Sequence, residues 1–424
     1  MIVNSPEFTS LFTHALNQLF TIFKTHDYEL RIAGGAVRDI LLKKKPKDVD
    51  FATTATPDEM KAMFQKLEVR TINNKGESHG TVTARIDSEN FEITTLRIDV
   101  VTDGRHAEVQ FTTDWERDAG RRDLTVNSMF LDQDGKLYDY FNGYQDLMDR
   151  RVVFVGNTEQ RIQEDYLRIL RYFRFYGRIA NSPDNHDPEC VRIIEKNRQC
   201  LARISGERIW VDLKKIVTGN FYGDLLKTII DCKLHQFLGL PDEPDMKEFE
   251  LVLNNTRGVE CNAITILSSM MKSSEEMVAF HQRCKLSCYE RDLGLFLISH
   301  RNKTYDCIGD YKLSIVAVKA KSTMALDWGK ELMKYRGDSK YIEEISNWTL
   351  PKFPIKGGMA VEHGAPAGKR LGPVLDRLLA HWVNSDFQMT PEELLKKVPE
   401  IVEELEKSRP KDRSSSPPGK KIKK

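Results

Sequence analysis

A glycine turn followed by two acids has the clearest chemistry in this chain. Gly34 and Gly35 open the turn, Arg38 follows them, and a predicted strand ends in the paired acids Asp48 and Asp50. Carboxylates at positions i and i+2 of an extended backbone point to the same side, where both can hold a divalent metal ion. Glycine lets backbone amides approach a phosphate closely. The combination indicates nucleotide transfer, whereas a pair of acids alone is more often a solvated strand edge or turn.

A second polar cluster lies at residues 121–129. Arg121 and Arg122 precede Asp123, and Asn127 follows. Because arginine has a forked set of donors that matches phosphate oxygens, the cluster could bind a triphosphate and its ribose. Its simpler interpretation is a capped helix start with exposed charges. In the predicted strand at residues 91–97, Glu92 is an acid among apolar and β-branched residues, which is costly unless that acid is paired, exposed or functional.

A third cluster is predicted to be a helix over residues 164–178. Asp165 and Arg168 are three residues apart, so they can address one ligand together. An ionised aspartate only accepts hydrogen bonds and an arginine only donates them, which matches a base edge with an amino group beside a ring nitrogen. Cytosine and adenine have that edge, whereas uracil and guanine have a carbonyl in place of the amino group. A solvated basic face is the alternative for the whole stripe of arginines, which comprises Arg168, Arg171, Arg174 and Arg178.

The composition predicts a large globular protein without a membrane span. The 424 residues are 40% hydrophobic, which is enough for about two to four units with cores of their own. There are 64 basic and 63 acidic residues, so a nucleic-acid partner would need a local basic surface. No apolar run reaches the length of about 18 residues that a spanning helix requires. Seven cysteines without a C-x-x-C pair predict reduced thiols in an intracellular protein.

The start of the chain is predicted to be an amphipathic core helix. Its apolar residues recur at helical spacing between Phe8 and Phe23, with Ser5 and Pro6 as the cap and the first turn. This pattern differs from that of a signal peptide. If the protein works in mitochondria, we therefore expect its targeting peptide to be absent from this chain.

The first third of the chain is predicted to be an α+β domain and the remainder helical. Strands are expected near residues 30–32, 49–52, 82–86, 91–97 and 128–131, which gives a small mixed sheet, and two helices follow Gly35 and the cap at Thr56. After Arg161 the pattern is almost continuously helical. Boundaries are expected near residues 156–158, 240–244 and 351–358. The basic end at 407–424 predicts a disordered extension, either a solubilising tail or an arm for nuclear import or RNA contact.

Together these motifs resemble one family, the class II tRNA nucleotidyltransferases or CCA-adding enzymes of the DNA polymerase beta superfamily. The family's motifs are similar, in order and spacing, to GGAVRD and DVD within residues 34–50, RRDLTVN at 121–127 and EDYLRILR at 164–171. The resemblance covers residues 28–215. Residues 204–209 resemble the helical element that braces the nucleotide-reading helix, and residues 357–387 a diverged tRNA-contacting region. A segment similar to the family's flexible loop comprises Asp103, Gly104, Arg105 and His106.

The resemblance implies a seahorse-shaped protein with an N-terminal nucleotidyltransferase head and an all-helical neck, body and tail. It places the catalytic head at residues 1–157, the base-recognising neck at 158–240, the body at 241–350, the tRNA-contacting tail at 351–406 and a disordered basic tail at 407–424. The implied activity is the addition of C, C and A to the 3′ end of tRNA from CTP and ATP, without a nucleic-acid template.

The resemblance also implies roles for individual residues. Asp48 and Asp50 would hold two Mg²⁺ ions, with Glu92 as a third catalytic carboxylate. Asp165 and Arg168 would read the base. The other nucleotide-binding residues that it implies are Gly34, Gly35, Arg38, Arg122, Asp123, Asn127, Arg171 and Arg174.

Alternatives exist inside and outside this family. A bacterial-type poly(A) polymerase has the same catalytic domain and differs in nucleotide choice, and a partial enzyme would add only CC or only A. A non-catalytic RNA-binding protein would need a broken metal pair or base reader, yet Asp48, Asp50, Asp165 and Arg168 are all present. We expect a protein of the mitochondrial matrix and the cytoplasm, with the nucleus and a homodimer left open, and no membrane partner.

Overall fold

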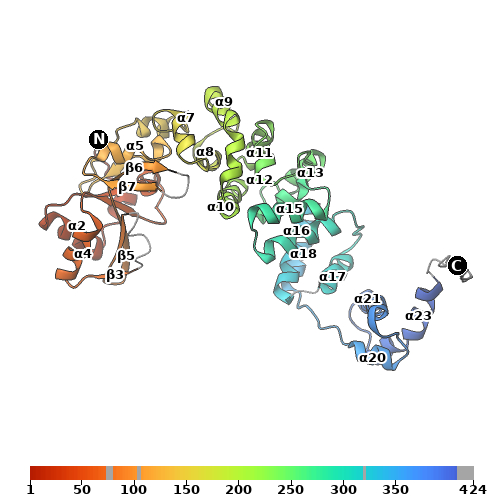
Figure 1. The fold of residues 1–424 in the computed structure, drawn as a ribbon. Helices are drawn as coiled ribbons and strands as arrows, with labels where there is room; N and C mark the ends of the chain where they lie inside the picture. Colours follow the sequence, from red (N-terminus) through yellow and green to blue (C-terminus); the bar gives the residue numbers. More distant parts are fainter. Residues whose placement is uncertain (73–79, 103–106, 319–320, 408–424) are drawn as a thin grey trace, which may run out of the picture. The chain divides into compact units, whose positions relative to one another are not determined.

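Two compact units make up the protein in the computed structural model (Figure 1). The structure describes residues 1–72, 80–102, 107–318 and 321–407. Unit 1 comprises Met1–Pro244 and Val278–Ser287, and unit 2 comprises Asp245–Met277 and the chain from Cys288 onward. Within the described ranges, no helix has both the length and the apolar composition that a membrane crossing needs.

Unit 1 contains a mixed sheet of seven strands in the order β3-β4-β5-β2-β1-β8-β9. β2 and β5 run parallel, whereas the other neighbouring strands are antiparallel. The predicted α+β class with an N-terminal mixed sheet is thereby confirmed. A separate antiparallel pair is formed by β6 (Arg97–Thr102) and β7 (Ala107–Phe111). The strands of the large sheet are β1 (Leu30–Ala33), β2 (Asp50–Thr53), β3 (Arg70–Ile72), β4 (Thr81–Ile86), β5 (Glu89–Thr95), β8 (Phe130–Leu131) and β9 (Leu137–Tyr138).

Four of these strands are absent from the prediction, namely β3, β6, β7 and β9. β3 has three residues and β9 has two, which is too short for the alternation of apolar and polar residues to be recognised. The predicted strand at residues 91–97 is also too long, because β5 ends at Thr95 and β6 begins at Arg97.

The helices of the first third pack against the sheet. α2 (His14–Thr25) contacts β1 and β4, and α4 (Pro57–Lys66) contacts β3 and β4. Thr56 caps α4 in a reciprocal capping box with Glu59, as the sequence predicts. The single N-terminal helix of the prediction is wrong. Ser5 caps the short α1 (Pro6–Thr9), and a second cap at Thr13, whose hydroxyl accepts from the N–H of Leu16, starts α2.

The rest of unit 1 is helical, as predicted, and among the described residues no strand follows β9. α10 packs against α8, which is the helix of the third motif, and α11 also contacts α8. The further helices of this unit are α3 (Gly35–Leu41), α5 (Trp115–Gly120), α6 (Gly143–Met148), α7 (Thr158–Glu164), α8 (Arg168–Ile179), α9 (Pro188–Lys196), α10 (Gly206–Val217), α11 (Tyr222–Asp231) and α12 (His235–Leu238).

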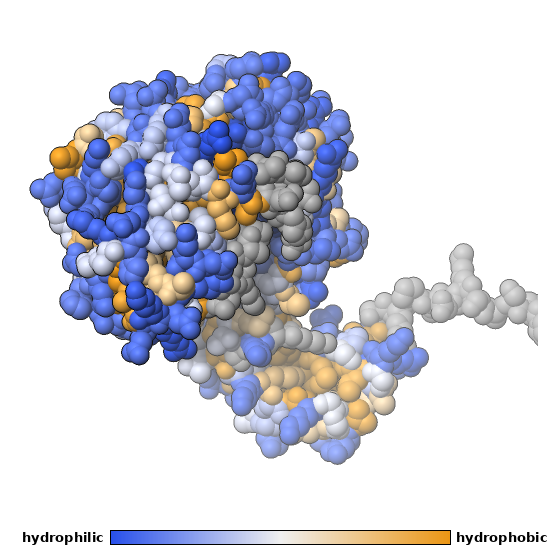
Figure 2. All heavy atoms as spheres, turned by 60° about the vertical axis from the view of Figure 1, so that its left-hand side comes forward, coloured by the Kyte–Doolittle hydropathy of each residue, from blue (hydrophilic) through white to orange (hydrophobic). Residues whose placement is uncertain are grey.

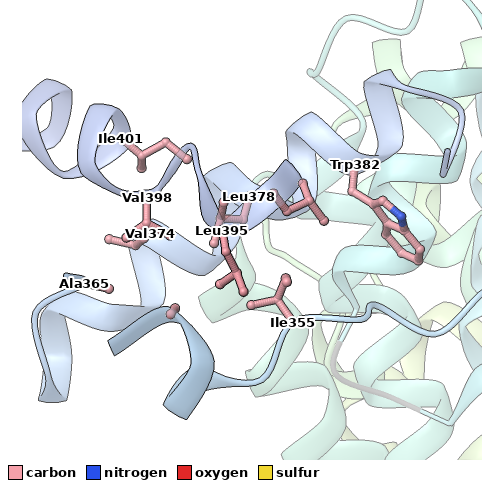
Figure 3. Close-up of a cluster of buried hydrophobic side chains, with 10 residues drawn as sticks. Ile355, Ala365, Val374, Leu378, Trp382, Leu395, Val398 and Ile401 are labelled. Atoms are coloured by element: carbon pink, nitrogen blue, oxygen red, sulfur yellow. The ribbon is translucent and has the colours of Figure 1, made fainter. Parts of the chain in front are cut away.

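Unit 2 is entirely helical in its described part, and its last segment has a core of its own. Figure 3 shows Val374 and Leu378 packed with Leu395, Val398 and neighbouring apolar side chains; all belong to one buried cluster. The main helices are α13 (Met246–Asn255), α14 (Ala263–Leu267), α16 (Cys288–His300), α17 (Ile308–Ala317), α18 (Ser322–Arg336), α19 (Ile342–Asn347), α20 (Gly357–Glu362), α21 (Leu371–Asn384), α22 (Pro391–Leu395) and α23 (Val398–Lys407), and the division between the units falls within α15 (Ser274–Cys284).

One view of the surface is shown in Figure 2. The nearer part of this face is dominated by hydrophilic residues with smaller apolar areas between them, and the fainter part below it has more apolar residues. All seven cysteines lie in the described residues and carry free thiols.

Candidate active site

Three acids from neighbouring segments meet in one cleft of unit 1. β2 begins at Asp50, and its parallel register with β5 places Asp50 beside Glu92. Asp48 lies two residues before the strand, in a bend. All three line a cleft of about 840 Å³. The prediction that the acids end a strand is wrong, because the strand begins with Asp50; the acid pair and Glu92 nevertheless share the cleft.

The surroundings of Asp50 disfavour its negative charge when no cation is bound. Desolvation in the cleft and then the negative charges of Glu92 and Asp48 raise the pKa of Asp50, although its side chain keeps contact with solvent. Among the described residues, no three acidic, histidine or cysteine side chains converge closely enough to hold a metal ion by themselves. Mg²⁺ commonly takes one or two carboxylates and completes its oxygen shell with phosphate groups and water. The acids therefore fit Mg²⁺ that is bound together with a triphosphate.

The glycine turn lies at the start of α3 and also lines the cleft. Gly34 caps this helix with φ of 64°, and its N–H donates to the carbonyl of Met129 at 3.1 Å. A Cβ at Gly34 would lie 3.0 Å from Nη1 of Arg122. Glycine is therefore needed here for its backbone conformation and for the room that it leaves to an arginine of the cleft.

Arg38 is held by protein partners. It is only 3% exposed, and it donates to Oδ1 of Asp39 from Nε at 3.1 Å and to Oδ1 of Asn127 from Nη1 at 2.5 Å. Burial lowers the pKa of Arg38, against the opposing effect of the Asp39 charge. The guanidinium lines the cleft. Its contact with a phosphate stays a prediction.

A buried aspartate that the sequence analysis does not single out orients the second cluster. Asp118, on α5, is 1% exposed and accepts from Nε of Arg121 at 2.8 Å and from Nη2 of Arg122 at 3.1 Å. Burial alone would raise the pKa of Asp118, but the charges of Arg122 and Arg121 outweigh it and hold this pKa below its ordinary value. The i+3 and i+4 spacing of these residues is a signal that could have identified Asp118.

Asp123 and Asn127 form a buried network with two arginines. Asp123 accepts from Nε of Arg171 at 2.6 Å and from Nδ2 of Asn127 at 3.2 Å, and Asn127 in turn accepts from Arg38. Burial alone would raise the pKa of Asp123, but the charge and hydrogen bond of Arg171 hold it below its ordinary value. Both Asp123 and Asn127 are 7% exposed. The simpler interpretation of this cluster, a helix start with exposed charges, is therefore wrong.

The third motif is two helices joined by a turn, so the predicted single helix over residues 164–178 is wrong. α7 ends at Glu164, Asp165 has an extended backbone with φ of −152°, and α8 begins at Arg168. Oδ1 of Asp165 accepts from the N–H of Leu167 at 3.1 Å, which stabilises the turn in place of helical hydrogen bonds. The N–H of Arg168 donates to the carbonyl of Asp165 at 2.9 Å, so the two residues remain neighbours in the cleft.

Asp165 and Arg168 have separate partners. Oδ2 of Asp165 accepts from Nη2 of Arg208 at 2.5 Å. Arg168 donates from Nη1 to Glu164 at 2.6 Å and to the carbonyl of Arg161 at 2.9 Å, and from Nη2 to the carbonyl of Arg121 at 2.8 Å. These contacts orient both side chains. The carboxylate of Asp165 can still accept a further hydrogen bond from a ligand, and Nε of Arg168 can still donate one.

The other arginines of α8 also have acidic partners. Arg174 donates to Oδ1 of Asp212 at 2.8 Å, and Arg178 donates to Oδ2 of Asp39 at 2.6 Å. The stripe is therefore not a freely solvated basic face. No role is predicted from the sequence for three acids that pair with arginines of α8, which are Asp39, Glu164 and Asp212. The same holds for Asp118 beside Arg121 and Arg122, and for Arg208 beside Asp165.

The cleft brings all the predicted catalytic and nucleotide-binding residues together. Its lining includes Asp48, Asp50, Glu92, Gly34, Gly35, Arg38, Arg122, Asp123, Asn127, Asp165, Arg168, Arg171 and Arg174. Their roles stay predictions. The predicted flexible loop at Asp103, Gly104, Arg105 and His106 lies outside the described residues.

Comparison with known proteins agrees with this arrangement. The family model "Poly A polymerase head domain" matches residues 30–153. The chain is 49% identical, over 401 residues, to the human protein named CCA tRNA nucleotidyltransferase 1, mitochondrial, and the match covers 93% of this chain and 92% of the human protein. This chain belongs to the CCA tRNA nucleotidyltransferase family. The resemblance seen in the sequence is thus confirmed, and the protein is a nucleotidyltransferase.

Solved structures of CCA-adding enzymes have the same fold. The Bacillus stearothermophilus CCA-adding enzyme in complex with CTP matches with a TM-score of 0.71 at 23% identity, over 96% of this chain and 100% of that chain. The Thermotoga maritima CCA-adding enzyme complexed with tRNA matches with a TM-score of 0.63 at 20% identity, over 95% and 99% of the two chains. At this identity the matches show the fold of this nucleotidyltransferase. The roles of its site residues have to be argued from the residues themselves.

The charge of the cleft suits a nucleotidyltransferase. Ten of its lining residues are arginine or lysine and six are acidic. Within this excess of positive charge, Asp48, Asp50 and Glu92 lie together on and beside two neighbouring strands. A triphosphate carries several negative charges, so a lining with this excess of positive charge is suited to attract it, and the acids are of the type that binds a divalent cation.

We expect Gly34→Ala to lower the kcat/KM of nucleotide addition about 10- to 100-fold. The new methyl group would force a strained backbone at positive φ and would displace the Arg122 guanidinium from its position near the turn. Gly156→Ala is the matched control, because Gly156 has a similar φ of 65° and no heavy atom within 4 Å of its added Cβ. Steady-state kinetics of both variants check this, and equal losses in the two would contradict it.

We expect Asp118→Asn to lower the free energy of unfolding at neutral pH by about 2–3 kcal/mol, because two arginines that retain some exposure lose their buried counter-charge. The depressed pKa of Asp118 means that its stabilisation exists above the unfolded-state pKa and is lost as the pH falls through the folded-state pKa. Urea unfolding at neutral and acidic pH should therefore show a difference that shrinks in acid. Asp114→Asn, which keeps a helix cap on α5, should be nearly neutral.

Proposed function

We propose that this nucleotidyltransferase adds C, C and A to the 3′ end of tRNA, using CTP and ATP and no nucleic-acid template. One observation carries the proposal: the acids Asp48 and Asp50 and the pair Asp165 and Arg168 lie in the same cleft of about 840 Å³. The name of the human relative and the CTP and tRNA bound by the bacterial enzymes support it. The site thus combines a place for nucleotidyl transfer with a place for reading a base.

The catalytic end would work through its acids. Asp48 and Asp50 would hold two Mg²⁺ ions, with Glu92 supporting their charge, and the metal would supply activation of the terminal ribose hydroxyl and neutralisation of the leaving pyrophosphate. The buried acid Asp118 holds Arg121 and Arg122 at the cleft, where their guanidiniums would meet the triphosphate or the sugar. Gly34 keeps the backbone close to that position.

The base end would select nucleotides by hydrogen bonding. Asp165 would accept from the amino group of cytosine or adenine, and Arg168 would donate to the adjoining ring acceptor. Arg208 and Glu164 are bonded to these two side chains and would orient them for the base. A uracil or guanine would set a carbonyl against the Asp165 carboxylate and would be rejected.

Product analysis at single-nucleotide resolution tests the function directly. With a tRNA that lacks its CCA end, CTP alone should give two added cytidines, and CTP with ATP should give one further adenosine. A ladder of adenosines with ATP alone would indicate a poly(A) polymerase, and a stop after CC with both nucleotides would indicate a partial enzyme. Absence of any metal-dependent incorporation would leave a non-catalytic RNA-binding protein.

The cellular location and the oligomeric state are separate parts of the proposal. The human relative is named mitochondrial, which supports a mitochondrial place of action for this protein. The cytoplasm, the nucleus and a homodimer stay predictions, and fractionation of cells and sedimentation of the purified chain would test them.

A further inference from the structure

Asp39 and Arg178 belong to two of the motifs, yet the proposed reaction assigns no role to either. Nη2 of Arg178 donates to Oδ2 of Asp39 at 2.6 Å. The other oxygen of Asp39, Oδ1, accepts from Nε and Nη2 of Arg38 at 3.1 and 3.0 Å. One carboxylate thus joins a buried arginine of the glycine-turn helix α3 to the last turn of α8.

Arg38 and Asp39 are buried, whereas Arg178 is partly exposed. Arg38 is 3% exposed and the Asp39 side chain 11%, whereas the Arg178 side chain is 45% exposed. Both Asp39 and Arg178 line the cleft. An ion pair with one exposed partner contributes little to stability. A role in geometry is therefore a better explanation for the Arg178 contact than a role in holding the fold together.

Among the described residues, three arginines of α8 donate side-chain hydrogen bonds to the first third of the chain. Near the start of the helix, Arg168 donates to the carbonyl of Arg121 at 2.8 Å, and one turn later Arg171 donates to Asp123 at 2.6 Å. The third hydrogen bond is that of Arg178 to Asp39. Because a helix rises 1.5 Å per residue, Arg168 and Arg178 are about 15 Å apart along the axis of α8.

The third hydrogen bond acts at the far end of α8. The contacts of Arg168 and Arg171 lie within one turn of α8 and leave the orientation of its far end to contacts further along the helix, which include the Phe175 ring 5.1 Å from the Arg38 guanidinium and the ion pair of Arg178. Arg178 holds that far end against α3, the helix whose first residue follows Gly34. The distance from the glycine turn to the base-reading residues at the start of α8 then depends on the Arg178 contact.

We propose that Arg178 is a positioning residue, whose ion pair with Asp39 fixes the angle of α8 and so sets the separation between the base-reading pair, Asp165 and Arg168, and the phosphate end of the cleft. This inference rests on the proposed function. Each nucleoside triphosphate has its own distance between its base edge and its phosphates, so for CTP a misplacement of about 1 Å at either end costs up to about 100-fold in rate. Arg178 thereby contributes to base selection without touching the base.

Kinetics of Arg178→Ala and Arg178→Lys test the proposal. The full-length protein is assayed with a tRNA that lacks its CCA end and with CTP, ATP or UTP in turn. Arg178→Ala should lower the ratio of kcat/KM for CTP over UTP about tenfold or more, mainly by lowering kcat for CTP, with the KM for tRNA within about twofold of wild type. Arg178→Lys keeps a charged donor and should recover most of the lost ratio.

Arg192→Ala is the matched control. Arg192 and Glu189 are exposed side chains of α9, and Arg192 donates to Glu189 at 2.6 Å. Neither lines the cleft, so Arg192→Ala removes an ion pair of equal length that has no contact with the base-reading residues. Its CTP over UTP ratio should equal that of wild type. Thermal unfolding of all three variants shows whether the Arg178 changes keep the fold, and Arg178→Lys keeps the test decisive where the alanine variant is unstable.

Four results would overturn the proposal. An unchanged CTP over UTP ratio with a raised KM for every nucleotide would make Arg178 a direct ligand contact. Unchanged kinetics with a lowered unfolding temperature would make its role purely structural. If the wild type adds no cytidine at all, the proposed function itself fails, and this inference fails with it. Wild-type addition of CCA together with normal selectivity of Arg178→Ala would overturn the positioning role alone.

Discussion

Asp48→Asn and Asp50→Asn are each expected to reduce addition of both C and A by at least about a thousandfold, which corresponds to about 4 kcal/mol of transition-state stabilisation. Asparagine keeps the shape of aspartate and removes the charge that a metal ion needs. Binding of tRNA should change little, because phosphate and shape contacts elsewhere dominate RNA affinity. Single-turnover rates and tRNA binding, measured on the same preparations, check both parts.

The stability of these variants separates a catalytic role from a structural one. Desolvation and the charges of Glu92 and Asp48 raise the pKa of Asp50, which means that its ionised form is disfavoured in the folded protein. Replacing Asp50 by asparagine removes that unfavourable charge at neutral pH. We therefore expect Asp50→Asn to unfold at the same temperature as the wild type or at a higher one, while its activity is lost.

Asp58→Asn provides a matched control for the acid pair. Asp58 is an almost fully exposed aspartate in the first turn of α4, with Lys61 as its neighbour and no part in the cleft lining. Its rate of nucleotide addition should remain within about twofold of wild type. If Asp48→Asn or Asp50→Asn retained more than about a tenth of wild-type turnover, the proposal that these acids hold Mg²⁺ would be wrong.

The local motifs could be predicted from the sequence because each depends on residues close in the chain. Gly34 with its positive φ, the cap at Thr56 and the acids Asp48 and Asp50 follow from residue type and short spacing. The break between α7 and α8 is local too, but the arginine pattern runs through it and hides it. Asp165 supplies the signal, since an aspartate side chain can bond a backbone N–H two residues on and end a helix.

The partners of the motif residues could not be predicted, because they are distant in sequence. Asp165 meets Arg208 across 43 positions, and Arg178 meets Asp39 across 139. Such pairs depend on how α8 and α10 pack and on which residues each helix turns toward the cleft. The strands β6 and β7 are a different case. They lie on either side of the dipeptide Asp103-Gly104 in the sequence, and such a dipeptide often indicates a hairpin. The two strands are not predicted because this segment is interpreted as the family's flexible loop.

Asp165→Ala should lower the ratio of kcat/KM for CTP over UTP about 10- to 100-fold. Asp165 uses one oxygen for Leu167 and the other for Arg208, and a carboxylate has about four acceptor sites, so capacity remains for the amino group of cytosine or adenine. Removing this acceptor leaves that amino group unpaired in the cleft, at about 1–3 kcal/mol, whereas the carbonyl of uracil no longer faces a negative charge. CTP and ATP should therefore lose efficiency while UTP loses less or gains.

A cap on another helix separates base reading from support of the helix. Asp187 accepts from the N–H of Glu189 at the start of α9, as Asp165 accepts from Leu167 before α8, but Asp187 does not line the cleft. Asp187→Ala should cost about 1 kcal/mol of stability and leave the CTP over UTP ratio unchanged. Should Asp165→Ala behave in the same way, with uniformly lower activity and an unchanged ratio, the residue would only hold the turn between α7 and α8. A changed ratio in Asp165→Ala alone would place the selection of the base at this carboxylate, because Asp187→Ala loses a similar backbone hydrogen bond and keeps the ratio.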